Sequence, residues 1–166
     1  MKYQILKSSK LVLLTFLITI TLPSCSSEDD SNTELFDSSF TALVDGEDFT
    51  ADEVNGLVLE SNEGNILTIE ASKESGAFIS ITLPSSDVGT YNATSTPDTQ
   101  ITTVYSSNGQ EALAGNSGTI TITESTQISP TTLRVKATFS FIYSDPINLV
   151  FYEVTNGSFT IDFIVF

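Results

Sequence analysis

Apolar and polar residues alternate along most of the chain from Ser38 onward, most clearly over residues 77–83, 132–143 and 158–165. An alternation with a period of two is typical of β-strands that have one buried face and one face in water. Val, Ile, Thr and Phe are abundant in these stretches and favour strands, and no window carries the pattern of an amphipathic helix. The pattern therefore predicts about nine or ten short strands, at residues 39–44, 47–54, 57–61, 65–72, 77–83, 101–106, 118–124, 132–143, 148–154 and 158–165.

Turn signals separate these strands. Asn-Gly pairs at 55–56, 108–109 and 156–157 are typical of two-residue hairpin loops, and Asp45-Gly46 and residues 62–65 mark further turns. We therefore predict an all-β fold: an antiparallel β-sandwich of about nine or ten strands, with a small β-barrel as the alternative. Residues 84–118 are the least regular part, and we interpret them as loops that are either functional or slack.

The N-terminus has the pattern of an export signal. Lys2, Lys7 and Lys10 precede a short apolar run, Leu11–Leu22, as in secretory signal peptides. The run is too short to span a bilayer, which needs about 20 apolar residues.

The apolar run ends in Leu22-Pro23-Ser24-Cys25, which resembles the lipobox of bacterial lipoproteins. The resemblance implies cleavage before Cys25 and acylation of that cysteine, and two or three acyl chains would anchor the protein stably. The alternative is an ordinary signal peptide with an unpaired cysteine at the junction. The acidic stretch at residues 26–30 is similar to the surface-export signal of Bacteroidetes lipoproteins, although a plain solvated tether has the same composition.

These features divide the chain into three parts. We expect a lipoprotein signal peptide over residues 1–24, an acylated cysteine with an acidic flexible tether over 25–37, and a single all-β domain over 38–166.

The body carries a second resemblance. The segments FTALVDGEDFTA (40–51), ATFSF (137–141) and VTNGSF (154–159) resemble a family of uncharacterised Bacteroidetes lipoproteins with the pattern FTAxVDG…TFSF…TNGSF. One departure is Ala137, where that pattern usually has glycine. The resemblance implies an all-β fold and a place in the cell envelope, and it implies no activity.

Composition excludes several kinds of chemistry. The formal net charge of −15 argues against nucleic acid as a partner, because phosphate would be repelled. The chain has no histidine, which excludes Ser-His-Asp and Cys-His catalysis. With one cysteine it forms no intrachain disulfide and offers zinc almost no ligands. We expect no cofactor, with Ca²⁺ as the metal that the remaining carboxylates would suit.

Two groups of residues are candidates for binding. Asp45, Glu47 and Asp48 could meet across a hairpin turn and form a weak calcium site, although a solvated turn in an acidic protein is the simpler explanation. Tyr91 and Tyr105 flank the irregular segment 84–118, and we predict that they contribute to a ligand-binding loop, the alternative being a place in the core or at its rim.

From the sequence we expect a non-enzymatic, lipid-anchored β-domain of the outer membrane that binds a glycan or a protein at the cell surface. One alternative is a glycoside hydrolase that uses two carboxylates. The other is a structural envelope lipoprotein that faces the periplasm.

Overall fold

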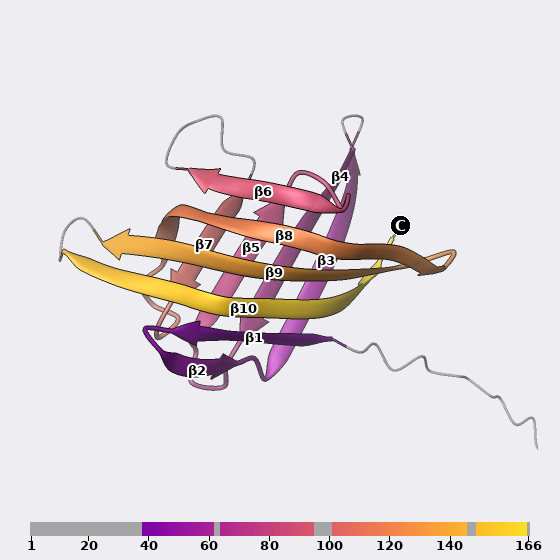
Figure 1. The fold of residues 1–166 in the computed structure, drawn as a ribbon. Coiled ribbons are helices and arrows are strands. Elements are labelled where there is room, and N and C mark those ends of the chain that lie inside the picture. The colour runs from indigo at the N-terminus through magenta and orange to yellow at the C-terminus, as the bar shows by residue number, and fades with distance from the viewer. Residues whose placement is uncertain (1–37, 62–63, 95–100, 146–148, 166) are drawn as a thin grey trace, which may run out of the picture. The chain divides into compact units, whose positions relative to one another are not determined.

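A computed structural model describes residues 38–61, 64–94, 101–145 and 149–165, and its secondary structure there is entirely β (Figure 1). Within these ranges the chain has no helix that is long and apolar enough to cross a membrane. The strands are β1 (Ser39–Val44), β2 (Glu47–Thr50), β3 (Glu53–Ser61), β4 (Gly64–Ser72), β5 (Phe78–Leu83), β6 (Gly89–Thr94), β7 (Thr102–Ser106), β8 (Leu113–Ser129), β9 (Thr132–Asp145) and β10 (Val150–Ile164).

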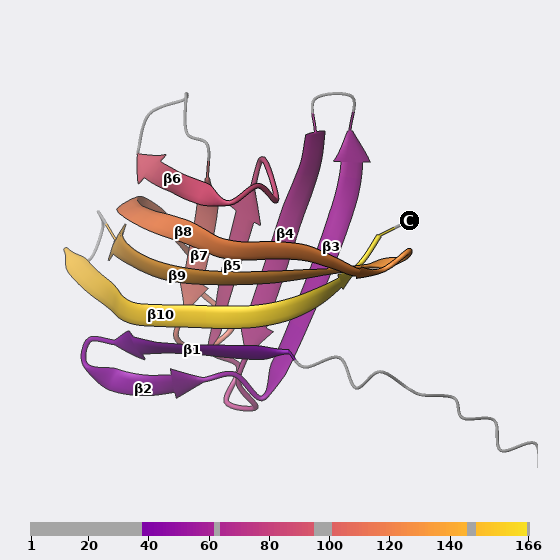
Figure 2. The same ribbon diagram turned by 45° about the vertical axis from the view of Figure 1, so that its right-hand side comes forward.

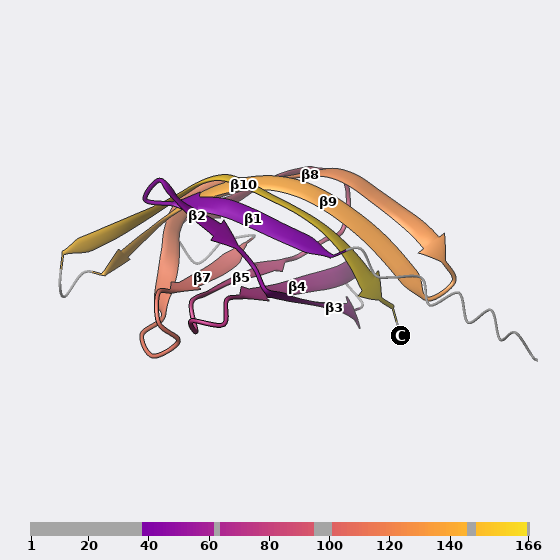
Figure 3. The ribbon, with the colours of Figure 1, turned by 90° about the horizontal axis from the view of Figure 1, so that it is seen from below.

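The strands form two layers that face each other (Figures 2 and 3). One layer has the order β2-β1-β10-β9-β8-β6, and the other has the order β3-β4-β5-β7, with antiparallel neighbours in both. Seen from below, the first layer arches over the second (Figure 3). The predicted all-β fold of nine or ten antiparallel strands is confirmed.

Hydrogen bonds also connect the two layers. Strand β7 pairs with the start of β8 through Val104 and Tyr105. At the other junction, β10 meets β3 in a short parallel contact between Ile164 and Leu57. These two junctions close the hydrogen bonding into a ring, so the fold combines the packed layers of a sandwich with the closure of a small barrel.

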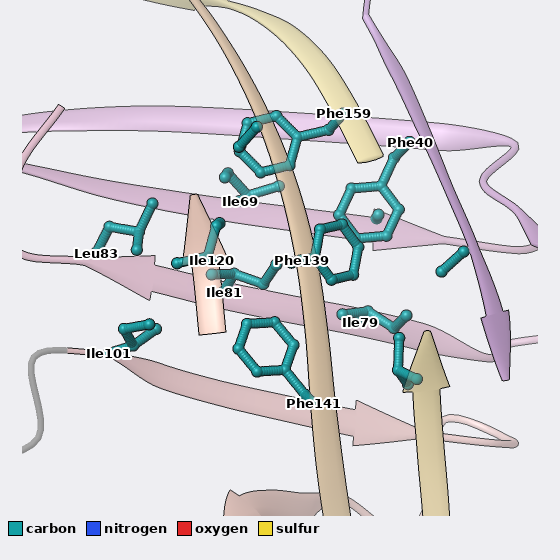
Figure 4. Packing of buried hydrophobic residues seen from close by; sticks show 14 of the residues in the cluster. Phe40, Ile69, Ile79, Ile81, Leu83, Ile101, Ile120, Phe139, Phe141 and Phe159 are labelled. Atoms are coloured by element: carbon teal, nitrogen blue, oxygen red, sulfur yellow. The ribbon is translucent and has the colours of Figure 1, made fainter. Parts of the chain in front are cut away.

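The core fills the space between the layers (Figure 4). Phe40, Phe139, Phe141 and Phe159 come from the first layer and lie against aliphatic residues of β4 and β5 such as Ile79. The Phe40 and Phe159 rings are stacked with centroids 6.2 Å apart. Burying each such ring stabilises the fold by about 1.5–3 kcal/mol, which explains why the alternation in the sequence identifies the strands.

The Asp45-Gly46 turn is confirmed. Val44 pairs directly with Glu47, so Asp45 and Gly46 alone connect β1 to β2. Both have positive φ, 51° at Asp45 and 83° at Gly46, which is the backbone that a type I′ hairpin requires.

The two-residue turns predicted at 55–56 and 156–157 are wrong. Asn55 and Gly56 lie inside β3 and pair with β4 without interruption. Asn156 and Gly157 lie inside β10, where the register shifts between Val154 and Gly157. There a β-bulge replaces the turn, and the predicted strands 148–154 and 158–165 form one continuous strand.

Residues 84–118 are more regular than predicted. They contain the whole of β6 and the first residues of β8. The third Asn-Gly pair, 108–109, does lie between two strands, in the longer connection from β7 to β8, where Ser106 Oγ accepts a hydrogen bond from the Gly109 amide at 2.9 Å. The turn predicted over 62–65 falls partly outside the described residues.

Candidate functional site

A pocket of about 330 Å³ lies at the end of the fold where β1 turns into β2. Its polar and aromatic wall comes from four places in the chain: the β1–β2 hairpin, the connection from β4 to β5, strand β7 and strand β10. The residues that supply this wall are Asp45, Glu47, Asp48, Phe49, Lys73, Ser75, Tyr105 and Tyr152. We call it the Tyr105 pocket.

The β1–β2 hairpin is fixed against β10 by two hydrogen bonds. The Asp45 amide donates to the Glu153 carbonyl at 2.8 Å, and the Glu153 amide donates to Asp45 Oδ1, also at 2.8 Å. Because the hairpin has a two-residue loop, these bonds also set the direction in which Glu47 and Asp48 leave it. The acidic residues of the β1–β2 hairpin are therefore held against the sheet rather than carried by a loose loop.

Two tyrosine rings form the aromatic wall. Tyr105 and Tyr152 lie with ring centroids 5.1 Å apart, and Tyr105 is only 6 % exposed. On the side toward the core, Tyr105 contacts Tyr143, and Tyr143 in turn contacts Phe141. A continuous row of rings thus joins the pocket to the core and holds Tyr105 in place.

Burial and local charge act on these tyrosines. Burial is the main cause that raises the pKa of Tyr105, and repulsion from Tyr152 and Asp45 adds to it. Burial also raises the pKa of Tyr143, against the opposing effect of its hydrogen bond with Thr103, whose oxygen lies 2.5 Å from the Tyr143 hydroxyl. Both phenols are therefore neutral at physiological pH.

Lys73 is the one basic residue of the wall. It lies where β4 ends, in a turn closed by a 2.8 Å hydrogen bond from its amide to the Ala77 carbonyl. Its ammonium group donates to the Asp48 carbonyl at 3.1 Å and lies 5.3 Å from the centroid of the Phe49 ring. This cation is held by an aromatic face and a carbonyl oxygen.

The structure separates the two predicted binding tyrosines. Tyr105 lines the pocket from β7, in the four-stranded layer. Tyr91 lies on β6, in the six-stranded layer, and its hydroxyl donates to the Asp87 carbonyl at 2.8 Å. That bond closes the connection that precedes β6, so Tyr91 has a local structural partner.

The three acidic residues predicted as a calcium site all line the Tyr105 pocket. Among the described residues, however, no three His, Cys, Asp or Glu side chains come together as a metal site. One oxygen of Asp45 already accepts the Glu153 amide. Cys25, the predicted lipidation site, lies outside the described residues.

The sequence reasoning did not single out Tyr152, Lys73 or Phe49 for this site. Tyr152 and Tyr105 are distant in the sequence and reach each other only because the two layers pack together. Lys73 had one available signal: it is one of only three basic residues after residue 10.

An exposed apolar tip lies at the same end of the fold. Leu149 is 77 % exposed and Phe151 is 67 % exposed, and Phe151 directly precedes Tyr152 of the pocket. The outer ends of β9 and β10 extend past the β1–β2 turn (Figure 1). Successive strand residues point to opposite faces, so the Phe151 side chain lies on the outer face of β10.

Comparison with known proteins gives a family and no activity. A family model described as "Domain of unknown function (DUF6252)" matches residues 37–161. No curated protein matches the chain, and no solved structure matches it.

Proposed function

The chain belongs to the family that shares this domain of unknown function, and from this premise we propose that it is a non-enzymatic binding module, anchored by lipid to the outer membrane and exposed at the cell surface. The lipobox-like Leu22-Pro23-Ser24-Cys25 and the acidic residues after it support the anchor and the address. The Tyr105 pocket supports the binding role.

The observation that carries the proposal is the position of the pocket relative to the start of the domain. Ser39 at the start of β1 pairs with Thr160, whereas Val44 at its end pairs with Val154, close to Tyr152. A strand of six residues separates its ends by about 17–20 Å. The β1–β2 turn, whose residues line the pocket, therefore lies at the end of β1 away from Ser39 (Figure 1), as suits a module that presents a ligand site away from the start of its domain.

The ligand of such a module is a glycan or a protein. Tyrosines and carboxylates serve both, and the exposed Leu149 and Phe151 favour a protein surface.

Protease treatment of intact cells tests the surface location, with lysed cells as the control. We expect cleavage of the domain on intact cells, and release of the protein from membranes in the Cys25→Ala variant. Protection on intact cells with cleavage after lysis would overturn the surface location and favour a structural lipoprotein that faces the periplasm.

A hydrolase is the second candidate, because three acidic residues line one pocket. Incubation with a panel of glycans tests it. Release of reducing sugar that is lost in the Glu47→Gln or Asp48→Asn variant would replace the binding function with an enzymatic one.

A further inference from the structure

The chemistry of the Tyr105 pocket points to one class of ligand. The inference rests on the proposed binding function and makes it more specific. Two tyrosines, one phenylalanine and three acidic residues line the pocket, together with a single lysine. Aromatic faces and carboxylates together recognise ammonium and guanidinium groups, through cation–π attraction and charge-assisted hydrogen bonds.

The Tyr105 hydroxyl is a further group that a ligand could bind. The residue is 6 % exposed, yet its hydroxyl has no hydrogen-bond partner among the described residues. No fully buried side-chain oxygen in these ranges lacks a partner, so this hydroxyl must touch solvent. A phenol oxygen in this position would accept a hydrogen bond from an N–H group of a ligand.

Lys73 shows that the wall accepts a cation. Its ammonium group lies over Phe49 and donates to the Asp48 carbonyl. Tyr152 and Glu47 supply a further ring and a further carboxylate to the same pocket. Lys73 also competes with an incoming cation, because like charges repel in a pocket of this size.

We propose that the Tyr105 pocket binds an alkylammonium or guanidinium group at Tyr152 and the carboxylate of Glu47. A basic side chain of a partner protein and a free polyamine both present this chemistry. Phe151 and Leu149, which are exposed at the same end of the fold, favour the basic side chain of a protein.

Calorimetric titration of the full chain in a neutral detergent tests the proposal. The probes are a short capped peptide with two arginines, the same peptide with citrulline in place of arginine, and spermidine. Citrulline matches the shape of arginine without its charge, and we expect it to bind at least about fivefold more weakly. Binding of the arginine peptide alone would identify a protein side chain as the source, and equal binding of spermidine would identify a polyamine.

Matched variants locate the binding. Glu47→Gln and Tyr152→Leu should each weaken binding of the arginine peptide about two- to fivefold, and Lys73→Met should strengthen it. Glu70→Gln is the control, because Glu70 is exposed on β4 and is not part of the pocket wall. An equal loss in Glu70→Gln, or equal binding of the citrulline peptide, would overturn the proposal.

Its failure is distinguishable from failure of the proposed function. If a neutral glycan binds in a Tyr152-dependent way and the arginine peptide does not, the cation site is wrong and the binding module stands. If the domain also faces the periplasm in intact cells, the surface function falls independently of any titration.

Discussion

The β1–β2 turn and the bulge of β10 begin with the same backbone conformation and end differently. Asp45 has φ 51° and Asn156 has φ 50°, and a glycine follows each. Gly46 also has positive φ, so the chain reverses, whereas Gly157 does not and the chain continues as a strand. One left-handed residue in an extended strand makes a bulge, and two in succession make a hairpin.

The surroundings of the two glycines explain the difference. A Cβ on Gly46 would meet nothing within 4 Å. A Cβ on Gly157 would lie 2.3–2.5 Å from three atoms of the Phe139 ring. Gly46 is needed for its conformation alone, and Gly157 is needed so that a core ring can lie across the strand. The turn places residues at the pocket, and the bulge makes room for a ring of the core.

The largest effect is expected for Gly157→Ala. Phe139 is 5 % exposed and contacts Phe40, Phe141 and Phe159, so a shift of its ring would disturb the packing of three other rings. Overpacking of this kind should lower the free energy of unfolding by about 3 kcal/mol. Urea unfolding followed by tyrosine fluorescence measures it, since the chain has no tryptophan.

The double variant Gly157→Ala with Phe139→Leu is the control. Leucine is shorter than the ring, so part of the loss should be recovered, and the two changes should be strongly non-additive. Additive losses would show that the ring contact is not what Gly157 accommodates.

Gly56→Ala is expected to have a smaller effect. The Asn55-Gly56 pair lies in β3, where a Cβ on Gly56 would meet Phe163 at 2.8 Å and the Ile161 methyl at 2.9 Å. Its φ is not in the left-handed region, so only packing opposes the alanine. We expect a loss of about 2 kcal/mol in the same urea experiment, and a gain in stability would contradict the packing role.

The strand-interior glycines explain what the sequence could and could not predict. Alternation identified nearly every strand, because each has one buried face. In β10 the inward residues change from even numbers, such as Val154, to odd numbers, such as Phe159. A turn and a bulge both produce that change of phase. The ring of Phe139, from β9, lies across Gly157 and decides in favour of the bulge. An Asn-Gly pair indicates a turn from local sequence alone. The rings that decide the outcome, Phe139 at Gly157 and Phe163 at Gly56, lie elsewhere in the chain.

The same reason limits the prediction of the site. The sequence pointed to Tyr105 and to the acids of the β1–β2 hairpin, which share one pocket. It did not point to Tyr152, because β7 and β10 belong to different layers. It also missed β6, since Gly89–Thr94 has few apolar residues to mark an alternation.

Gly46→Ala should cost about 1 kcal/mol, because alanine must adopt positive φ without meeting any neighbour. Gly46→Asn should recover much of this loss, since asparagine tolerates the left-handed region. Urea unfolding of the two variants side by side is the measurement. Equal losses would mean that conformation is not what requires glycine in the turn.

The smallest effect on stability is expected for Asp45→Asn. Asparagine tolerates the left-handed backbone, and its side-chain oxygen can still accept the Glu153 amide, so the free energy of unfolding should change by no more than about 0.5 kcal/mol. The negative charge at the Tyr105 pocket is lost, however, and binding of an arginine peptide should weaken about two- to fivefold. Glu70→Gln, which removes the same charge elsewhere, should leave binding unchanged.

A variant that binds less and unfolds as before would separate the two roles of the Asx-Gly pairs, because Gly157→Ala should do the opposite: it should unfold more easily while its folded fraction binds normally. If Asp45→Asn lost as much stability as Gly157→Ala, the turn would belong to the core framework, and the division between the two regions would be wrong.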